Sequence, residues 1–231
     1  MNILLENIGK RFNKEWIFRN VNYEFSSGNK YAILGTNGCG KSTLLQIIAG
    51  ASSQTEGEIS IIPTPHLNEL RSQPSVVHKG GLSRSTLSPL GRDGEGWLFR
   101  NLSLAAPYLE LPEEMTWNEA VKFHGKFKKY VSGFSEEKII SLSGLESSSE
   151  KEIRNFSSGM KQRARLTLAI LSDTPLLFLD EPSTNLDANA VKWYQNLIEE
   201  FGKERLVIVC SNYNKEEYSF CTEELVIGTR A

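Results

Sequence analysis

The chain has 231 residues, of which 39% are hydrophobic and 23% charged, the ordinary proportions of one globular domain or of one core with a small subdomain. Its net charge of −2 provides no long-range field that would attract nucleic acid or acidic lipid, so we expect no nucleic-acid partner. Unbroken apolar runs such as Leu206–Cys210 are far shorter than the roughly 20 residues that span a bilayer, and the N-terminus shows no signal-peptide pattern.

The first third of the chain predicts short β-strands that lead into a glycine-rich loop. Asn20 and residues 26–29 punctuate the apolar runs as turns. Four runs are expected to form strands: Ile3–Ile8, Ile17–Phe18, Val21–Phe25 and Lys30–Leu34. After the loop, a helix-like run at Ser42–Ala49 is closed by Gly50. Strand, glycine loop and helix in this order are typical of a phosphate site.

The middle of the chain has an irregular part and a helical part. Prolines and glycines interrupt any hydrophobic period in residues 63–96, which predicts a long irregular surface loop without chemistry of its own. The pattern then predicts one strand and two helices: Trp97–Ala105, Thr116–Lys129 and Glu136–Leu142. The basic residues near Lys126 are interpreted as the solvated face of a helix.

From Gly159 onward the pattern alternates between helix and strand. The expected order is a helix at 159–171, strand Leu176–Leu179, helix Ala188–Phe201, strand Leu206–Cys210, helix Lys215–Phe220 and strand Glu224–Ile227. Hydrophobic strands that alternate with amphipathic helices predict an α/β fold with a mainly parallel sheet covered on both faces.

The glycine-rich loop matches the phosphate-loop pattern G-x-x-x-x-G-K-[ST]. Its residues are Gly35, Thr36, Asn37, Gly38, Cys39, Gly40, Lys41, Ser42 and Thr43. Such glycines let backbone N–H groups turn toward phosphate oxygens, and the helix N-terminus adds a favourable dipole. Lys41 would reach the β- and γ-phosphates, and Ser42 would hold Mg²⁺. A simple glycine turn that caps a helix is the alternative, but the strand before it and the helix after it favour a nucleotide site.

A second motif is the buried strand at 176–179 that ends in two acids, Asp180 and Glu181. In a phosphate-loop protein an Asp at this strand end holds the Mg²⁺ shell. The adjacent Glu181 is then placed to orient or deprotonate the attacking water. Alone this pair is a weak signal, but together with the loop at Gly35 it predicts ATP hydrolysis.

Between these motifs lies the sequence Asn155–Arg163, which reads NFSSGMKQR. Ser157 and Ser158 could cap the helix that begins near Gly159, and a helix N-terminus that offers Ser hydroxyls is also an anion site. This segment resembles the signature motif of ABC-type ATPases, in the form FSSGM where the common form is LSGGQ. Residues 183–187 look like the D-loop of that family, and the resemblance covers nearly the whole chain.

The resemblance implies a phosphate-loop NTPase core with a mainly parallel sheet, an N-terminal antiparallel β subdomain and a small α-helical subdomain. On this basis residues 1–62 would form the antiparallel part with the phosphate loop, and 63–96 an irregular loop or insertion. Residues 108–157 would form the helical subdomain, and 158–231 the remainder of the α/β core.

The resemblance also implies a site shared by two subunits that pack head to tail. Ser157, Ser158 and Gly159 would contact the γ-phosphate held by Lys41 of a second subunit, which we expect to be a second copy of the chain. Asp187 would lie at the same shared site as part of the D-loop. Phe12 would stack on adenine, with Trp16 as the alternative stacking residue and core packing as the alternative role for Phe12.

Two side chains that the family usually carries are missing. The three histidines, His66, His78 and His124, all precede the signature segment, so Asn212 takes the place of the histidine that contacts the γ-phosphate. Asn can donate a hydrogen bond to a phosphate oxygen but cannot carry a proton. The family also has a glutamine at the end of the strand before the helical subdomain, where this chain reads LAAPY at 104–108. We therefore expect slow turnover.

The function that the resemblance implies is that of an ATP-binding and ATP-hydrolysing subunit, with ATP and Mg²⁺, that powers transport through a separate integral membrane permease. Its length resembles compact exporter-type ATPases. The location would be cytoplasmic and peripheral on the inner face of the cell membrane, in keeping with three cysteines that show no disulfide or metal spacing. Tyr108, Phe123 and Phe127 would contact the permease or, as we prefer for most of them, fill the core of the helical subdomain.

Two alternatives to this function stay open at the level of sequence. The first is a nucleotide-gated binding module with little turnover that regulates a membrane partner, as the missing histidine and glutamine would permit. The second is a soluble ABC protein that acts on ribosomes or DNA. Soluble translation types usually have two fused ATPase domains and DNA-repair types have long coiled coils, and neither feature is present here.

Overall fold

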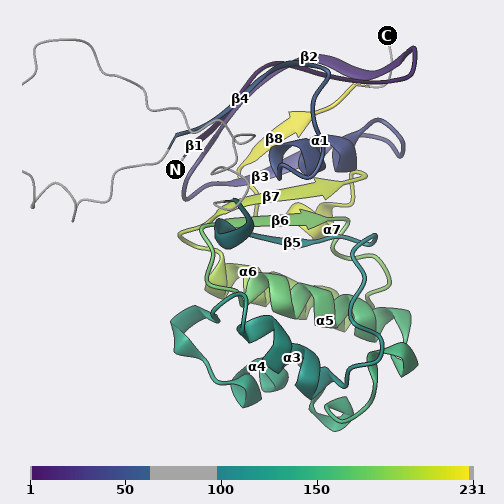
Figure 1. The fold of residues 1–231 in the computed structure, drawn as a ribbon, viewed down its shortest axis with the longest axis vertical. Coiled ribbons are helices and arrows are strands. Elements are labelled where there is room, and N and C mark those ends of the chain that lie inside the picture. Colours follow the sequence, from purple (N-terminus) through teal and green to yellow (C-terminus); the bar gives the residue numbers. More distant parts are fainter. Residues whose placement is uncertain (1, 63–97, 229–231) are drawn as a thin grey trace, which may run out of the picture.

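The computed structural model describes residues 2–62 and 98–228, which form two stacked sheets and a layer of helices (Figure 1). The predicted irregular loop at 63–96 lies outside the described residues. The predicted α/β fold, with a mainly parallel sheet and an N-terminal antiparallel sheet, is confirmed.

The antiparallel sheet consists of β1 (Asn2–Phe12), β2 (Glu15–Ser26) and β4 (Glu56–Ile62), in the order β2-β1-β4. The prediction of two strands separated by a turn at Asn20 is wrong, because β2 is continuous. Asn20 adopts a left-handed conformation (φ 55°) at a shift in register between β1 and β2. A turn residue therefore serves here as a bulge, which twists the strand without ending it. Strand β4 was not expected from the sequence.

The parallel sheet has five strands in the order β5-β6-β7-β3-β8. They are β3 (Lys30–Leu34), β5 (Leu102–Ala105), β6 (Leu176–Asp180), β7 (Leu206–Ser211) and β8 (Glu223–Val226). Every residue of β6 and β7 is buried, as a sheet covered on both faces requires. Alternate side chains of these strands enter two separate cores, one toward the antiparallel sheet and one toward the helices.

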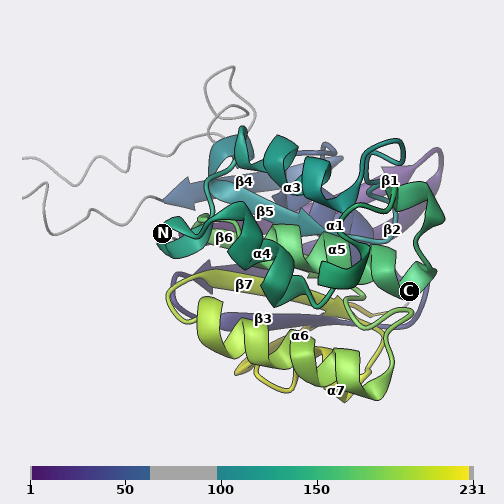
Figure 2. The same ribbon diagram turned by 90° about the horizontal axis from the view of Figure 1, so that it is seen from below.

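Helix α1 (Lys41–Ile48) lies between the two sheets, and the other main helices cover the opposite face of the parallel sheet (Figure 1). These are α3 (Trp117–Gly125), α4 (Glu136–Ser143), α5 (Ser158–Ile170), α6 (Ala188–Phe201) and the short α7 (Lys215–Tyr218). Figure 2 shows this layer from below, with α3, α4 and α5 on one side and α6 and α7 on the other.

Two predicted elements differ in extent. The strand expected at Trp97–Ala105 is wrong in its first half, because residues 98–101 are helical and only Leu102–Ala105 pair with β6. Leu98 is buried against Gly50 at the end of α1. This packing favours a helical turn, which directs the Leu98 side chain toward α1. The helix expected at Thr116–Lys129 ends at Gly125.

The aromatic residues expected to fill the helical core do not lie there. Tyr108, Phe123 and Phe127 have exposed fractions of 43%, 40% and 58%, so the preference for a core role is wrong for these three. The core residue of this region is Trp117, which is fully buried and donates from Nε1 to Ser143 Oγ on α4 at 3.2 Å. It follows the N-cap Thr116, which forms a capping box with Glu119.

Replacing Trp117 by Ala is expected to lower the free energy of unfolding by about 3–5 kcal/mol, because it leaves a cavity between α3 and α4. The exposed Phe127→Ala change is the matched control and should stay within about 1 kcal/mol. Chemical denaturation followed by circular dichroism measures both. Equal losses in the two variants would contradict the assignment of Trp117 as the core residue of this layer.

Candidate functional site

The glycine-rich loop connects β3 in the centre of the parallel sheet to α1. Cys39 N donates to Thr36 O at 3.2 Å to close the turn, and Gly40 is the N-cap of α1 with a φ of 105°. A Cβ atom on Gly40 would lie 2.5 Å from Ile17 Cγ2 and 2.8 Å from Phe18 Cδ1. Both the conformation and the close approach of β2 therefore require glycine at this position.

The N-terminus of α1 opens onto a cavity of about 220 Å³. Its lining residues are Ile17, Asn37, Gly38, Gly40, Lys41, Ser42, Thr43 and Glu181. Lys41 is buried, and its Nζ donates to Gly35 O at 2.9 Å and Thr36 O at 3.2 Å. Within the described residues the ammonium group forms no direct ion pair, and it is held by the loop that it would leave for a phosphate. The cavity is smaller than a typical whole-ligand pocket of about 300–1,000 Å³ and suits a phosphate chain.

Asp180 stands at the end of β6, beside this cavity. It is 2% exposed, and burial raises the pKa of its carboxyl group, while a hydrogen bond with the Ser42 side chain and the charge of Lys41 lower it. Within the described part of the chain, Asp180 Oδ1 is buried and has no hydrogen-bond partner. A buried carboxylate oxygen without a partner, next to a serine hydroxyl, fits the oxygen ligands that Mg²⁺ prefers.

Glu181 follows with a left-handed backbone (φ 45°), which is uncommon for a residue with a long side chain. Its N–H donates to Cys210 O on β7 at 3.0 Å, and its side chain lines the phosphate-sized cavity. The parallel register explains why it lies here, since Asp180 pairs with Cys210 and Leu34 with Ser211. The carboxyl ends of β3, β6 and β7 therefore meet, and Asn212 follows directly after this edge.

The signature segment does not reach this cavity within one chain. Ser157 is the N-cap of α5 and accepts from Met160 N at 3.2 Å, while Ser158 and Gly159 begin the helix. Helix α5 and helix α1, which follows the glycine-rich loop, pack on opposite faces of the parallel sheet (Figure 1). Gly159 lies against the D-loop segment, where an added Cβ would stand 2.9 Å from Asn185 O. Asp187 caps α6 by accepting from Ala190 N at 2.7 Å.

The two candidates for base stacking lie near β2, outside the phosphate-sized cavity. Phe12 is 52% exposed, so it does not pack in the core, and Lys10 Nζ lies 4.9 Å from its ring centroid. The Trp16 ring is covered by the guanidinium groups of Arg19 and Arg11, at 4.1 and 5.3 Å from its centroid. Phe12 is therefore the freer of the two rings.

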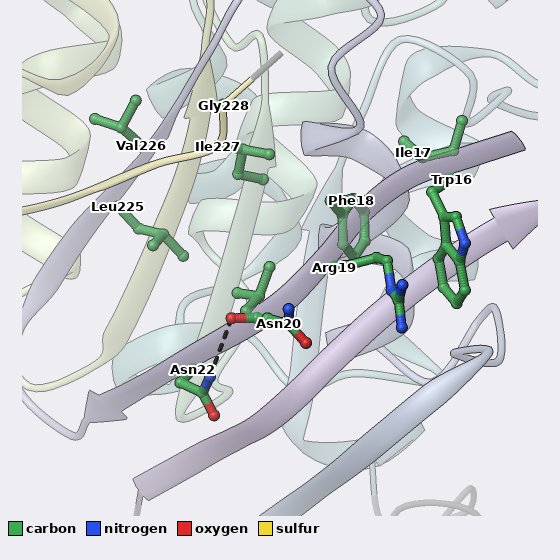
Figure 3. Close-up of a pocket in the computed structure, with 11 residues that line it drawn as sticks. Trp16, Ile17, Phe18, Arg19, Asn20, Asn22, Leu225, Val226, Ile227 and Gly228 are labelled. Carbon is green, nitrogen blue, oxygen red and sulfur yellow. Dashed lines mark hydrogen bonds between the residues drawn. The ribbon is translucent and has the colours of Figure 1, made fainter. Parts of the chain in front are cut away.

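A larger cavity of about 680 Å³ lies between β2 and the edge strand β8 (Figure 3). Figure 3 shows Trp16 and Arg19 on the β2 side, and Leu225, Val226 and Ile227 on the β8 side. Ile17 lines both this cavity and the phosphate-sized one, so the two adjoin at β2. No motif in the sequence predicts this larger cavity beside the phosphate loop.

Sequence reasoning also missed the polar role of Tyr108. Burial raises the pKa of its phenol, and the nearby Asp180 carboxylate raises it further. A hydrogen bond to Gln46 lowers this pKa. The hydroxyl therefore lies between α1 and the end of β6. The pairing of Ala105 with Leu179 brings the segment after β5 to this place. An exposed aromatic in a loop carries no sequence signal for such a position.

The comparisons with known proteins agree with this geometry. A family model described as "ABC transporter" matches residues 18–184. The lantibiotic transport ATP-binding protein SrtF of Streptococcus pyogenes is 28% identical over 90% of this chain and 79% of its own length. The aliphatic sulfonates import ATP-binding protein SsuB of Bacillus cereus is 29% identical over 98% of this chain and 81% of its own length. The two names differ in the cargo, and both describe an ATP-binding protein of a transport system.

Solved structures show the same fold. A dimeric ATP-binding cassette in a post-hydrolysis state, bound to ADP and phosphate, has a TM-score of 0.76 at 20% identity. The match covers 97% of this chain and 94% of that one. The ATP-binding subunit of an ABC transporter has a TM-score of 0.75 at 21% identity and covers 100% of this chain and 89% of that one.

Two glycines of the loop allow a matched test of the site. Gly38 and Gly40 both have positive φ, but an added Cβ meets nothing within 4 Å at Gly38 and meets Ile17 and Phe18 at Gly40. Gly40→Ala should therefore weaken Mg·ATP binding about tenfold more than Gly38→Ala, which introduces backbone strain alone. Calorimetric titration of the purified variants measures this, and equal affinities would contradict the described loop.

Proposed function

Because this chain belongs to the ABC transporter family, we propose that it binds and hydrolyses ATP with Mg²⁺ as one of two subunits that pack head to tail, and that it powers transport through a separate membrane permease. The observation that carries the proposal is the meeting of Lys41, Ser42 and Glu181 around one phosphate-sized cavity, with the unpartnered oxygen of Asp180 beside it.

In this proposal the chain's own groups divide the chemistry among them. The backbone N–H groups at the start of α1 and the Lys41 ammonium bind the β- and γ-phosphates. Ser42 and Asp180 hold Mg²⁺, which would neutralise charge that develops on the phosphate oxygens. Glu181 orients the attacking water or accepts its proton, from a backbone position fixed by the hydrogen bond to Cys210.

The exposed N-terminus of α5 supports the proposal of a second subunit. The α5 N-terminus presents Ser157 and Ser158, which are both exposed and do not line the phosphate-sized cavity. A helix N-terminus with hydroxyl groups is an anion site that its own chain does not fill. Head-to-tail pairing would place it against the γ-phosphate of the partner. Asn212, exposed after β7, would donate to the same phosphate.

The permease would dock in a groove at the side of the chain, which we call the lateral groove. It consists of two adjoining cavities of about 560 and 440 Å³ that share Phe99, Leu104, Leu109 and Lys128. Phe99 is 62% exposed, and Phe123 and Phe127 stand beside the groove residues His124 and Lys128. A large exposed apolar surface marks an interaction site. The charged residues that line it are Lys128, Arg165 and Glu110, and their net positive charge favours an amphipathic helix that ends in acidic residues.

No helix within residues 2–62 and 98–228 is long and apolar enough to cross a membrane. In the proposal, coupling to transport acts through the lateral groove and a partner that spans the bilayer. The end of β5 belongs both to this groove and, through the pairing of Ala105 with Leu179, to the edge of the sheet that carries Asp180.

A second candidate is the nucleotide-gated binding module with little turnover. It is favoured by the buried Ala106, which follows β5 beside Asp180 and offers no polar group to the metal, and by Asn212, which cannot carry a proton. Turnover separates the two candidates.

Glu181→Gln should lower steady-state turnover about 10²-fold or more while Mg·ATP affinity changes little, because Gln cannot accept the proton of water. The exposed Glu114→Gln change removes the same charge away from the site and should leave turnover as in the wild type. Phosphate release by the purified chain measures both, with and without its reconstituted permease. Equal inactivity of wild type and Glu181→Gln with the permease present would favour the binding module.

Phe99→Ala should weaken retention of the permease about tenfold, because a central exposed aromatic is a typical anchor of an interface. Val226→Ala is the control, since Val226 is similarly exposed (56%) but lies on β8, away from the lateral groove. Co-purification from detergent-solubilised membranes, with the permease quantified against the tagged chain, measures the effect. Equal retention by both variants would argue against the lateral groove as the docking site.

A further inference from the structure

A line of hydrogen bonds connects the lateral groove to the loop that follows Glu181. Arg165, on α5, donates from Nε to Leu109 O in the groove wall at 2.7 Å. Its Nη1 donates to Gln162 Oε1, one turn earlier on the helix, at 3.3 Å. Gln162 Nε2 in turn donates to Pro182 O at 3.0 Å. Leu109 and Pro182 are thus joined through two side chains of one rigid helix.

The chemistry of the two side chains gives this line a fixed direction. A guanidinium group only donates hydrogen bonds and stays protonated, so Gln162 must turn its oxygen toward Arg165. Its amide nitrogen is then left for Pro182 O, and this bond is buried because Gln162 is 2% exposed. Without Arg165, Gln162 Oε1 would lose this donor, and the amide would keep only the bond from Nε2 to Pro182 O to hold it in place.

The far end of the line is a segment that needs support. Glu181 has a left-handed backbone, a conformation that persists only where its surroundings hold it. Glu217, buried on α7, accepts from Ser183 N at 3.2 Å and from Ser183 Oγ at 2.7 Å. Residues 182 and 183 are therefore held by α5 on one side and by α7 on the other, directly after the proposed base.

We propose that Arg165 is a positioning residue that acts through Gln162 and Pro182 to hold Glu181 in place, and that it makes this placement depend on the wall of the lateral groove at Leu109. The inference rests on the proposed function, since it presumes that Glu181 acts on water. It assigns the coupling between partner docking and hydrolysis to one forked side chain. Movement of the groove wall would pull on Arg165 and change the support of the catalytic loop.

A double-mutant cycle tests the line. Arg165→Met and Gln162→Met should each lower kcat about 10- to 100-fold with KM for Mg·ATP unchanged, because a displaced catalytic group slows the reaction more than it weakens binding. The double variant should be no slower than the slower single variant, since both changes cut the same line. Arg165→Lys should stay slow, because one ammonium group cannot reproduce the fork.

The control is Arg154→Met, which removes an exposed arginine whose side chain pairs, among the described residues, with the half-buried Glu152. It should leave kcat unchanged in the wild-type chain, and it should leave the kcat of Gln162→Met unchanged as well. Strictly multiplicative losses for Arg165→Met and Gln162→Met, full activity of Arg165→Lys, or a rise in KM with kcat unchanged would each overturn the proposal.

Hydrogen exchange provides a readout that needs no turnover. In the purified chain, Arg165→Met should speed amide exchange in residues 183–186 about tenfold, with the same thermal midpoint and unchanged exchange in α6. Unchanged exchange in 183–186 would overturn the positioning role even in an active enzyme. If wild type showed no turnover but this exchange responded, the proposed hydrolysis would fail and the mechanical connection would stand.

Discussion

The site depends on the parallel register of three neighbouring strands. Because β3 and β6 both pair with β7, the ends of all three strands lie at one edge of the sheet, with Leu34 opposite Ser211 and Asp180 opposite Cys210. Each strand is buried on both faces, so none can slip without moving a row of apolar side chains. Groups that are distant in sequence are therefore held together more rigidly than loops alone could hold them.

The buried charges at this edge favour a ligand that carries both positive and negative charge. The buried Asp180 carboxylate has an oxygen without a partner within the described residues, and Lys41 is satisfied only by carbonyl groups of its own loop. Buried charged groups in such surroundings are costly unless an ion of opposite charge joins them. A metal ion with a phosphate chain would meet both needs, and this physical demand agrees with the family to which the chain belongs.

The loop after Glu181 joins the main parts of the molecule. Pro182 is bonded to Gln162 on α5 and Ser183 to Glu217 on α7, and the preceding Glu181 is bonded to Cys210 on β7. Helix α5 carries the signature serines at its N-terminus, and Arg165 reaches the lateral groove from two turns further along. Docking, pairing of subunits and hydrolysis would thus act on one short segment whose strained backbone makes it sensitive to its neighbours.

The fold class, the glycine loop and the order of motifs could be predicted from the sequence, because they depend on local patterns: glycine spacing, hydrophobic period and capping residues. Local patterns failed where a signal had a tertiary use, as with Asn20, a turn residue that forms a bulge in β2. They also failed at residues 98–101, which the pattern predicts as strand but which are helical, with Leu98 packed against Gly50 at the end of α1. The exposure of Phe123 and Phe127 and the position of Tyr108 near Asp180 depend instead on how distant segments pack. The same holds for the connection of Leu109 to Pro182 through Arg165 and Gln162. Such contacts are set by how sheets and helices pack, and a pattern along one segment carries no information about the segment that packs against it.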